Sequence, residues 1–256
     1  MVVGLDLFQK HFQGYTDHYV LIGGSACDWH LEKEGLIFRA TKDLDIILIV
    51  EALSDDFVNH FWEFIKEGEY AIAEVGDKKS FYRFIQPQTE GYPKMIELFS
   101  RNPDVIKEYP GMHLTDIPTG EDASSLSAIL LDDIFYKFTI DNTIISDGLH
   151  IANDCALICL KVRAFLSNKT RRDEGHVVQE VDITKHKNDI IKLAAILDPQ
   201  TRVDVPLMIK TDLLSYIDYL KMESPDIGQI LKQQGMGNIR LEQIIQQLNN
   251  TFYRIT

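Results

Sequence analysis

The 256-residue sequence lacks the marks of a membrane or secreted protein. It has no apolar run of about 18 residues, so we expect no membrane-spanning segment. Residues 1–6 contain no basic region followed by an apolar stretch, so no secretory signal is predicted. Cysteine is scarce, and two of the three cysteines have the four-residue spacing of one helical face (Cys27, Cys155 and Cys159). We interpret them as small buried side chains in a reducing, cytoplasmic setting, in preference to metal ligands or a disulfide.

Positive charge is also in the minority. The chain has 26 basic and 39 acidic side chains, which gives a net charge of −13. A surface of this charge is a poor general platform for nucleic acid. Residues 161–192 differ, since they hold eight basic and five acidic side chains, a local charge of +3. Phosphate contacts are expected there, and the alternative is a solvated helix face with a loop.

Several catalytic motifs are absent. No Gly-x-x-x-x-Gly-Lys-Ser/Thr run is present, which excludes a P-loop NTPase. No Gly-x-Ser-x-Gly elbow is present, which argues against an α/β-hydrolase. The eight histidines are scattered without a paired ligand spacing, so a structural role is expected for each.

The apolar patterns predict an α/β (α+β) fold with a mixed sheet of about five strands. The expected strands are 19–22, 43–50, 70–75, 80–86 and 94–100, and the expected helices among them are 26–34 and 55–67. Residues 101–126 are rich in turn formers and read as a connection. Helices follow at about 153–167, 185–197, 207–222, 226–234 and 239–253, with a strand near 143–151. We therefore predict a mixed α/β domain at 1–110 and a mainly helical domain at 111–256.

Two aspartates open the strand predicted at 43–50. Residues i and i+2 of a strand point to the same face, so Asp43 and Asp45 are expected side by side. Their mutual repulsion falls when a divalent cation lies between them. Mg²⁺ held by one or two carboxylates usually completes its shell with substrate phosphates. The pair therefore indicates Mg²⁺- or Mn²⁺-assisted chemistry on a nucleotide.

A Gly23-Gly24-Ser25 turn precedes this strand by 18 residues, after the strand at 19–22. Glycines allow backbone N–H groups to approach a phosphate closely, and a helix that begins there adds its positive dipole end. Alone, such a turn is only a strand-to-helix connection. Together with Asp43 and Asp45 it predicts a cradle for a polyphosphate that shares the metal.

A third carboxylate is often needed to hold a second metal or to activate the attacking hydroxyl. Glu97 is the candidate because it lies in the apolar strand at 94–100, where burial of an unpaired carboxylate is expensive. The alternative is an edge residue that faces water.

The Gly23-Gly24-Ser25 turn followed by Arg39-Ala40-Thr41-Lys42-Asp43-Leu44-Asp45 resembles the nucleotidyltransferase superfamily that includes DNA polymerase β. The likeness is nearest to its AbiEii-like branch, which includes toxins of abortive-infection and toxin–antitoxin systems. Lys161 resembles the lysine on a later helix of that branch, and residues 185–193, which include Asp189, resemble its basic segment.

The resemblance implies Mg²⁺-dependent (or Mn²⁺-dependent) transfer of a nucleotidyl group from an NTP to a hydroxyl of an RNA such as tRNA, a protein or a small molecule. It implies metal binding by Asp43 and Asp45, with Glu97 as the inferred third ligand. It also implies nucleotide binding by a further set of residues (Gly23, Gly24, Ser25, Lys42, Lys161 and Asp189). Lys161 would neutralise triphosphate charge, and Asp189 would orient that lysine or contact the nucleotide, so the helical domain at 111–256 would complete the nucleotide site. A cognate antitoxin would be a protein partner. One alternative is a non-catalytic nucleotide- or partner-binding module that kept the fold. Another is a structural protein whose Asp43 and Asp45 cap a strand in solvent.

Overall fold

The computed structural model of the chain describes residues 2–39, 41–49, 52, 54–74, 81–99, 129 and 132–255. These residues form two compact units, each of which is described by itself. Unit 1 comprises the described residues of Met1–Trp29, Arg39–Leu131 and Thr143–Ala152, and unit 2 comprises His30–Phe38, Asp132–Asn142 and those of Asn153–Thr256. The units alternate along the chain, whereas the sequence prediction divides it once, near residue 110. The predicted connection at 101–126 lies outside the described residues.

Unit 1 is built on a mixed seven-stranded sheet, which confirms the mixed α/β class. The strand order is β3-β4-β5-β2-β1-β7-β6. The strands are β1 (Tyr19–Ile22), β2 (Asp43–Leu48), β3 (Ala71–Glu74), β4 (Phe81–Ile85), β5 (Met95–Phe99), β6 (Thr143–Ser146) and β7 (Leu149–Ala152). Strand β2 runs antiparallel to β1 and parallel to β5, which places β2 inside the sheet.

All five expected strands are present, and the sheet has two more because residues 143–152, where one strand was expected, form a hairpin. Strands β6 and β7 pair in antiparallel fashion around Asp147 and Gly148. These two residues have φ angles of 52° and 72°, the left-handed values that a two-residue hairpin turn requires. Asp-Gly supplies that conformation readily, so the hairpin follows from local turn chemistry.

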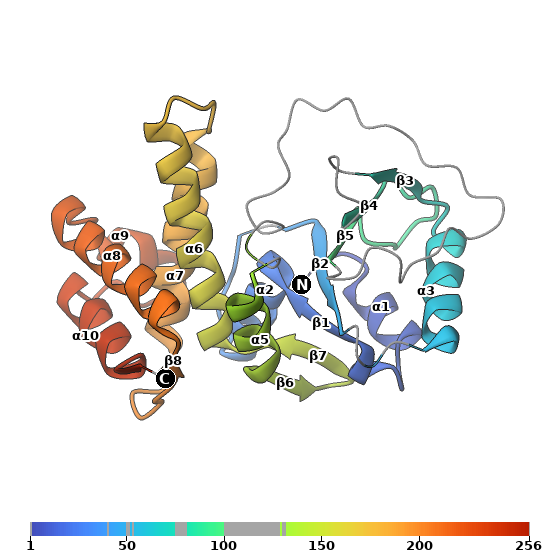
Figure 1. Cartoon of the computed structure of the whole chain (residues 1–256), viewed down its shortest axis with the longest axis horizontal. Coiled ribbons are helices and arrows are strands. Elements are labelled where there is room, and N and C mark those ends of the chain that lie inside the picture. Colours follow the sequence, from blue (N-terminus) through green and yellow to red (C-terminus); the bar gives the residue numbers. More distant parts are fainter. Residues whose placement is uncertain are drawn as a thin grey trace. The chain divides into compact units, whose positions relative to one another are not determined.

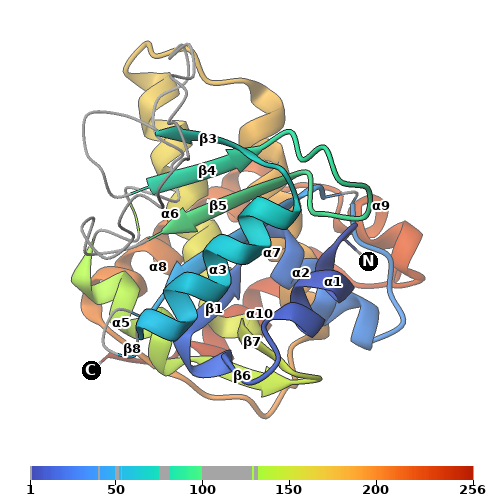
Figure 2. The same ribbon diagram turned by 90° about the vertical axis from the view of Figure 1, so that its right-hand side faces the viewer.

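Helices α1 (Leu5–His11) and α3 (Asp55–Glu67) cover one face of this sheet (Figure 2). Helix α3 begins as predicted, where the Ser54 side chain accepts a hydrogen bond from the Phe57 N–H. Phe84 of β4 contacts Phe61 and Trp62 of α3, with ring centroids 5.5 and 5.8 Å apart. The sheet residues on the same face as Phe84 therefore form the core between the sheet and α3.

Helix α1 is not predicted by the sequence, and its packing explains why it forms. Phe8 and Phe12 are fully buried and meet Tyr19 of β1 and Phe64 of α3 in an aromatic cluster. Such rings contribute burial and edge-to-face contacts that a seven-residue helix could not obtain alone. Tertiary packing thus stabilises a helix that is short by local criteria.

Unit 2 is mainly helical (Figure 1). Its helices are α5 (Asp133–Asp141), α6 (Asp154–Asp173), α7 (Glu180–Ile196), α8 (Leu207–Glu223), α9 (Ile227–Leu231), a 3₁₀ turn (Lys232–Gln234) and α10 (Leu241–Thr251), with the short strands β8 (Asp204–Val205) and β9 (Arg254–Ile255). The Asn153 side chain caps α6 by accepting from the Ala156 N–H at 2.9 Å. Cys155 and Cys159 are buried free thiols on α6, as predicted. Among the described residues no helix has the length and apolar character needed to cross a membrane, as expected.

Candidate functional site

The junction of β1 and helix α2 (Gly23–Lys33) lies against the side chain of Asp45. The helix begins at Gly23, three residues earlier than predicted, so the predicted turn is its first turn. Gly23 has a φ of +68°, and a Cβ built there would lie 1.7 Å from Asp45 Oδ2. Only glycine permits both this backbone conformation and this approach. The structure therefore brings the glycine junction and Asp45 together within unit 1.

Gly24 is also approached closely, though less so than Gly23. A Cβ at Gly24 would lie 2.8 Å from Thr41 Oγ1 and 3.4 Å from Arg39 Nη2. Arg39 and Thr41 belong to the same motif as the two aspartates, so its polar side chains gather around the start of α2. The first turn of a helix of 11 residues also directs backbone N–H groups and positive partial charge at this position.

Ser25 is placed differently from its neighbours. Its side chain is buried, and Ser25 Oγ donates to the Ile22 carbonyl at 3.2 Å. This hydrogen bond ties the first turn of α2 to the end of β1. The contact of Ser25 with a phosphate remains a prediction. It would require the Ser25 hydroxyl to donate to the phosphate in place of the Ile22 carbonyl.

Asp43 and Asp45 lie on one face of β2, as their spacing predicts, and both are partly exposed. Leu44, between them, is fully buried on the face that α1 and α3 cover. Both aspartates therefore occupy the opposite face of the sheet. Lys42, which precedes the strand, is exposed.

Glu97 of β5 is the direct register partner of Asp45, across the parallel β2–β5 pair. Neighbouring strands lie about 4.8 Å apart, and register partners point to the same face. Glu97 is therefore beside the aspartates, as the prediction requires. It is not an edge residue facing water, since its side chain is 14% exposed and β4 lies beyond it.

Arg83 of β4 holds Glu97 on its other side. Arg83 Nε and Nη2 both donate to Glu97 Oε1, at 2.8 and 2.5 Å. This residue is not among those predicted from the sequence, although a basic side chain in the apolar run Phe81-Tyr82-Arg83-Phe84-Ile85 is a usable signal. A buried charge in such a strand requires a partner of opposite sign.

The site is thus a row of charged side chains that crosses β4, β5 and β2 and ends at the glycine junction. It contains three carboxylates and one guanidinium (Asp43, Asp45, Glu97 and Arg83), and the guanidinium of Arg39 lies at its junction end. The described part of the chain contains no preassembled group of three or more metal-ligating side chains. Two aspartates next to a glycine cradle still fit Mg²⁺ or Mn²⁺, because Mg²⁺ commonly takes one or two carboxylates and shares the phosphates of its substrate.

Lys161 and Asp189 lie in unit 2, where they contact each other. Lys161 Nζ of α6 donates to Asp189 Oδ2 of α7 at 2.9 Å, and the two side chains are 8% and 1% exposed. Asp189 thus orients Lys161, which is one of the two roles that the resemblance implies for it. The binding of nucleotide phosphates by this pair remains a prediction.

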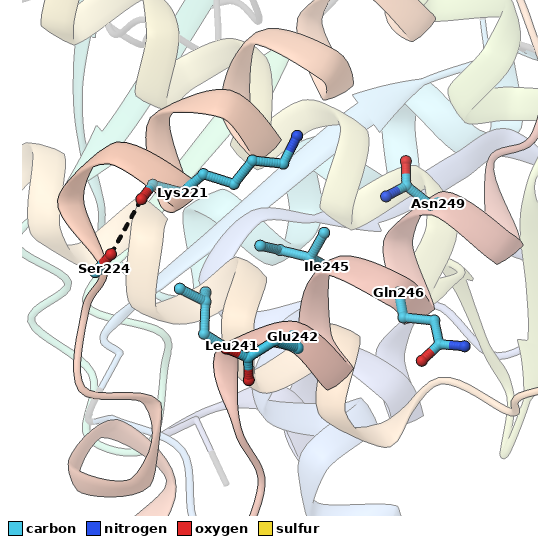
Figure 3. A pocket seen from close by; sticks show the side chains of 7 residues that line it. All are labelled: Lys221, Ser224, Leu241, Glu242, Ile245, Gln246 and Asn249. Carbon is cyan, nitrogen blue, oxygen red and sulfur yellow. Dashed lines mark hydrogen bonds between the residues drawn. The ribbon is translucent and has the colours of Figure 1, made fainter.

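Unit 2 also has a shallow groove of about 540 Å³ between α8 and α10 (Figure 3). Its lining mixes polar and apolar side chains (Lys221, Ser224, Leu241, Glu242, Ile245, Gln246 and Asn249). The Lys221 ammonium already donates to Asp218 at 2.9 Å. No residue of the predicted site lines this groove, so the groove has no part in the predicted nucleotide chemistry.

Comparison with known proteins gives no independent assignment. No protein-family model matches the chain, and no curated protein matches it either. The function must therefore be inferred from the site residues alone.

Proposed function

We propose that this protein is a nucleotidyltransferase of the DNA polymerase β-like superfamily. In this proposal it moves a nucleotidyl group from an NTP to a hydroxyl acceptor with the help of Mg²⁺ or Mn²⁺. The acceptor is an RNA such as tRNA, a protein or a small molecule. A toxin–antitoxin or abortive-infection setting, with a cognate antitoxin as partner, belongs to the same proposal.

One observation supports the proposal above the others. Asp45 Oδ2 occupies the space that a side chain at residue 23 would fill. The proposed metal ligand Asp45 and the proposed phosphate-binding residue Gly23 are therefore direct neighbours. A structural protein whose Asp43 and Asp45 only cap a strand in solvent would not need Asp45 to approach Gly23 so closely. A polyphosphate that shares a cation with Asp43 and Asp45 needs both parts side by side.

Each residue then has a physical task. A divalent cation bound here would supply Lewis-acid stabilisation of the charge that develops on the transferring phosphoryl group. Asp43 and Asp45 would hold it on one face of β2, and the N–H groups at Gly23 and Gly24 would orient the β and γ phosphates. Glu97 is beside Asp45 and would act on the acceptor side. Positioning and charge stabilisation supply most of the rate in phosphoryl transfer.

The test is transfer of label from α-³²P NTPs, supplied with Mg²⁺, to total RNA, to protein and to small hydroxylated molecules. The wild-type chain should label one acceptor class. Asp45→Asn should lower this activity at least about 100-fold, since even the outer partners of metal ligands are worth 10- to 100-fold. Asp204→Asn, an exposed aspartate of β8 in unit 2, is the matched control and should retain full activity.

The ion pair at Glu97 favours a second candidate, a non-catalytic module that binds nucleotide. Glu97 Oε1 already accepts two hydrogen bonds from Arg83, so this carboxylate is less available to orient an attacking hydroxyl. Tight binding of Mg²⁺-NTP by the wild-type chain, with no label on any acceptor, would favour this candidate. If Asp45→Asn kept both nucleotide binding and nucleotidyl transfer, the catalytic and the non-catalytic candidate would both be refuted.

A further inference from the structure

Arg83 and Glu97 form an ion pair that the proposed reaction does not require. The two side chains are register partners on β4 and β5 and are only 18% and 14% exposed. Arg83 Nε and Nη2 both donate to the same carboxylate oxygen, Glu97 Oε1. The guanidinium is thus held by an adjacent strand on the side of Glu97 away from β2.

We propose that Arg83 takes the place of a second divalent cation at Glu97, so that the site holds one metal ion per bound nucleoside triphosphate. This inference rests on the proposed function. It assigns Arg83 as a positioning residue, because Arg83 acts through Glu97 and not on the reacting atoms.

The charge beside Glu97 supports one ion. The Arg83 guanidinium supplies at Glu97 Oε1 the positive charge that a second cation would otherwise provide. A guanidinium carries its positive charge on a rigid planar fork, and Arg83 holds that fork against Glu97 Oε1. A second cation at Glu97 would lie next to this fixed positive charge and would be repelled by it.

Removal of the guanidinium should release a second binding position. Asp45 and Glu97 are partners on adjacent strands, about 4.8 Å apart in backbone position, and two carboxylates at this spacing can share a cation. Arg83→Gln keeps a polar side chain and removes the charge. Arg83→Lys keeps the charge in a shorter side chain and should therefore keep the wild-type stoichiometry.

Native mass spectrometry counts the ions directly. The probe is Mn²⁺ with each of the four α,β-methylene nucleoside triphosphates, which cannot react at the α phosphate. In the nucleotide-bound species we expect one Mn²⁺ for the wild type and for Arg83→Lys, and two for Arg83→Gln. Arg83→Gln/Glu97→Gln should return to one. Arg202→Gln, an exposed arginine in a loop of unit 2, is the matched control and should hold one.

The outcomes separate this inference from the proposed function. Two Mn²⁺ ions in the wild-type complex, or one in Arg83→Gln, would overturn the inference and leave the proposed function in place. A wild-type chain that binds no nucleotide with Mn²⁺ would overturn both. The wild-type count tests the inference even where Arg83→Gln fails to fold, which circular dichroism would reveal.

Discussion

Replacement of Gly23 by alanine should destabilise unit 1 in two separable ways. The φ of +68° imposes a left-handed conformation that disfavours any Cβ by about 1–2 kcal/mol. The new Cβ would also lie 1.7 Å from Asp45 Oδ2 and 2.5 Å from its Cγ, so the carboxylate must move. Overpacking of this kind costs about 1–3 kcal/mol. The free energy of unfolding should therefore fall by about 2–5 kcal/mol.

The assay is urea unfolding followed by tryptophan fluorescence, because both tryptophans, Trp29 and Trp62, belong to unit 1. Gly91→Ala is the matched control, since Gly91 has a φ of +87° and no atom within 4 Å of an added Cβ. It should lose only the backbone part, about 1–2 kcal/mol. Equal losses in the two variants would refute the claim that Gly23 makes room for Asp45.

A double-mutant cycle identifies the clashing group. Asp45→Ala removes the carboxylate atoms at 1.7 and 2.5 Å and leaves its Cβ at 2.9 Å. The Gly23→Ala substitution should therefore be at least about 1 kcal/mol less destabilising in an Asp45→Ala background. Strict additivity of the two substitutions would mean that the side chains of residues 23 and 45 do not meet.

Two further predictions concern unit 2. Lys161→Met or Asp189→Leu alone should lower the free energy of unfolding by about 3–5 kcal/mol, because each removes one member of a buried ion pair. In urea unfolding followed by circular dichroism, the double variant should be more stable than either single variant. An additive loss would contradict this. Although burial opposes it, hydrogen bonds from Lys187 and Tyr219 hold the pKa of Glu223 below its usual range. Its stabilising contribution is therefore present above the unfolded pKa of about 4.3 and lost as the pH falls through the lower folded value. Glu223→Gln should lower the free energy of unfolding at neutral pH by less than about 1 kcal/mol, because the Lys187–Glu223 ion pair is partly exposed. The difference from the wild type should vanish in acid. A difference that persists in acid would contradict the lowered pKa of Glu223.

Local chemistry explains which features of the fold were predictable. The two-residue period of a strand was sufficient to place Asp43 and Asp45 on one face. The amphipathic run at 55–67 was sufficient to predict α3, which begins at Asp55 behind its Ser54 cap. The apolar run around Glu97 identified a strand, and its single acidic residue identified a carboxylate that needs a partner.

Other features depend on contacts between distant parts of the chain. The pairing of Arg83 with Glu97 requires the register of β4 and β5, which the sequence pattern does not specify. The burial of Ser25 depends on the start of α2 at Gly23, and helix boundaries are set by capping and packing together. Helix α1 forms through its aromatic contacts and carries no strong local signal.

The most direct test of the proposed nucleotide site is the anomalous scattering of Mn²⁺ in crystals grown with an α,β-methylene nucleoside triphosphate. We expect one peak in contact with carboxylate oxygens of Asp43 and Asp45, at about the 2.1 Å typical of a small divalent cation. We also expect the β and γ phosphates to lie at Gly23 and Gly24. A bound nucleotide whose Mn²⁺ lies away from both aspartates would contradict the proposed site.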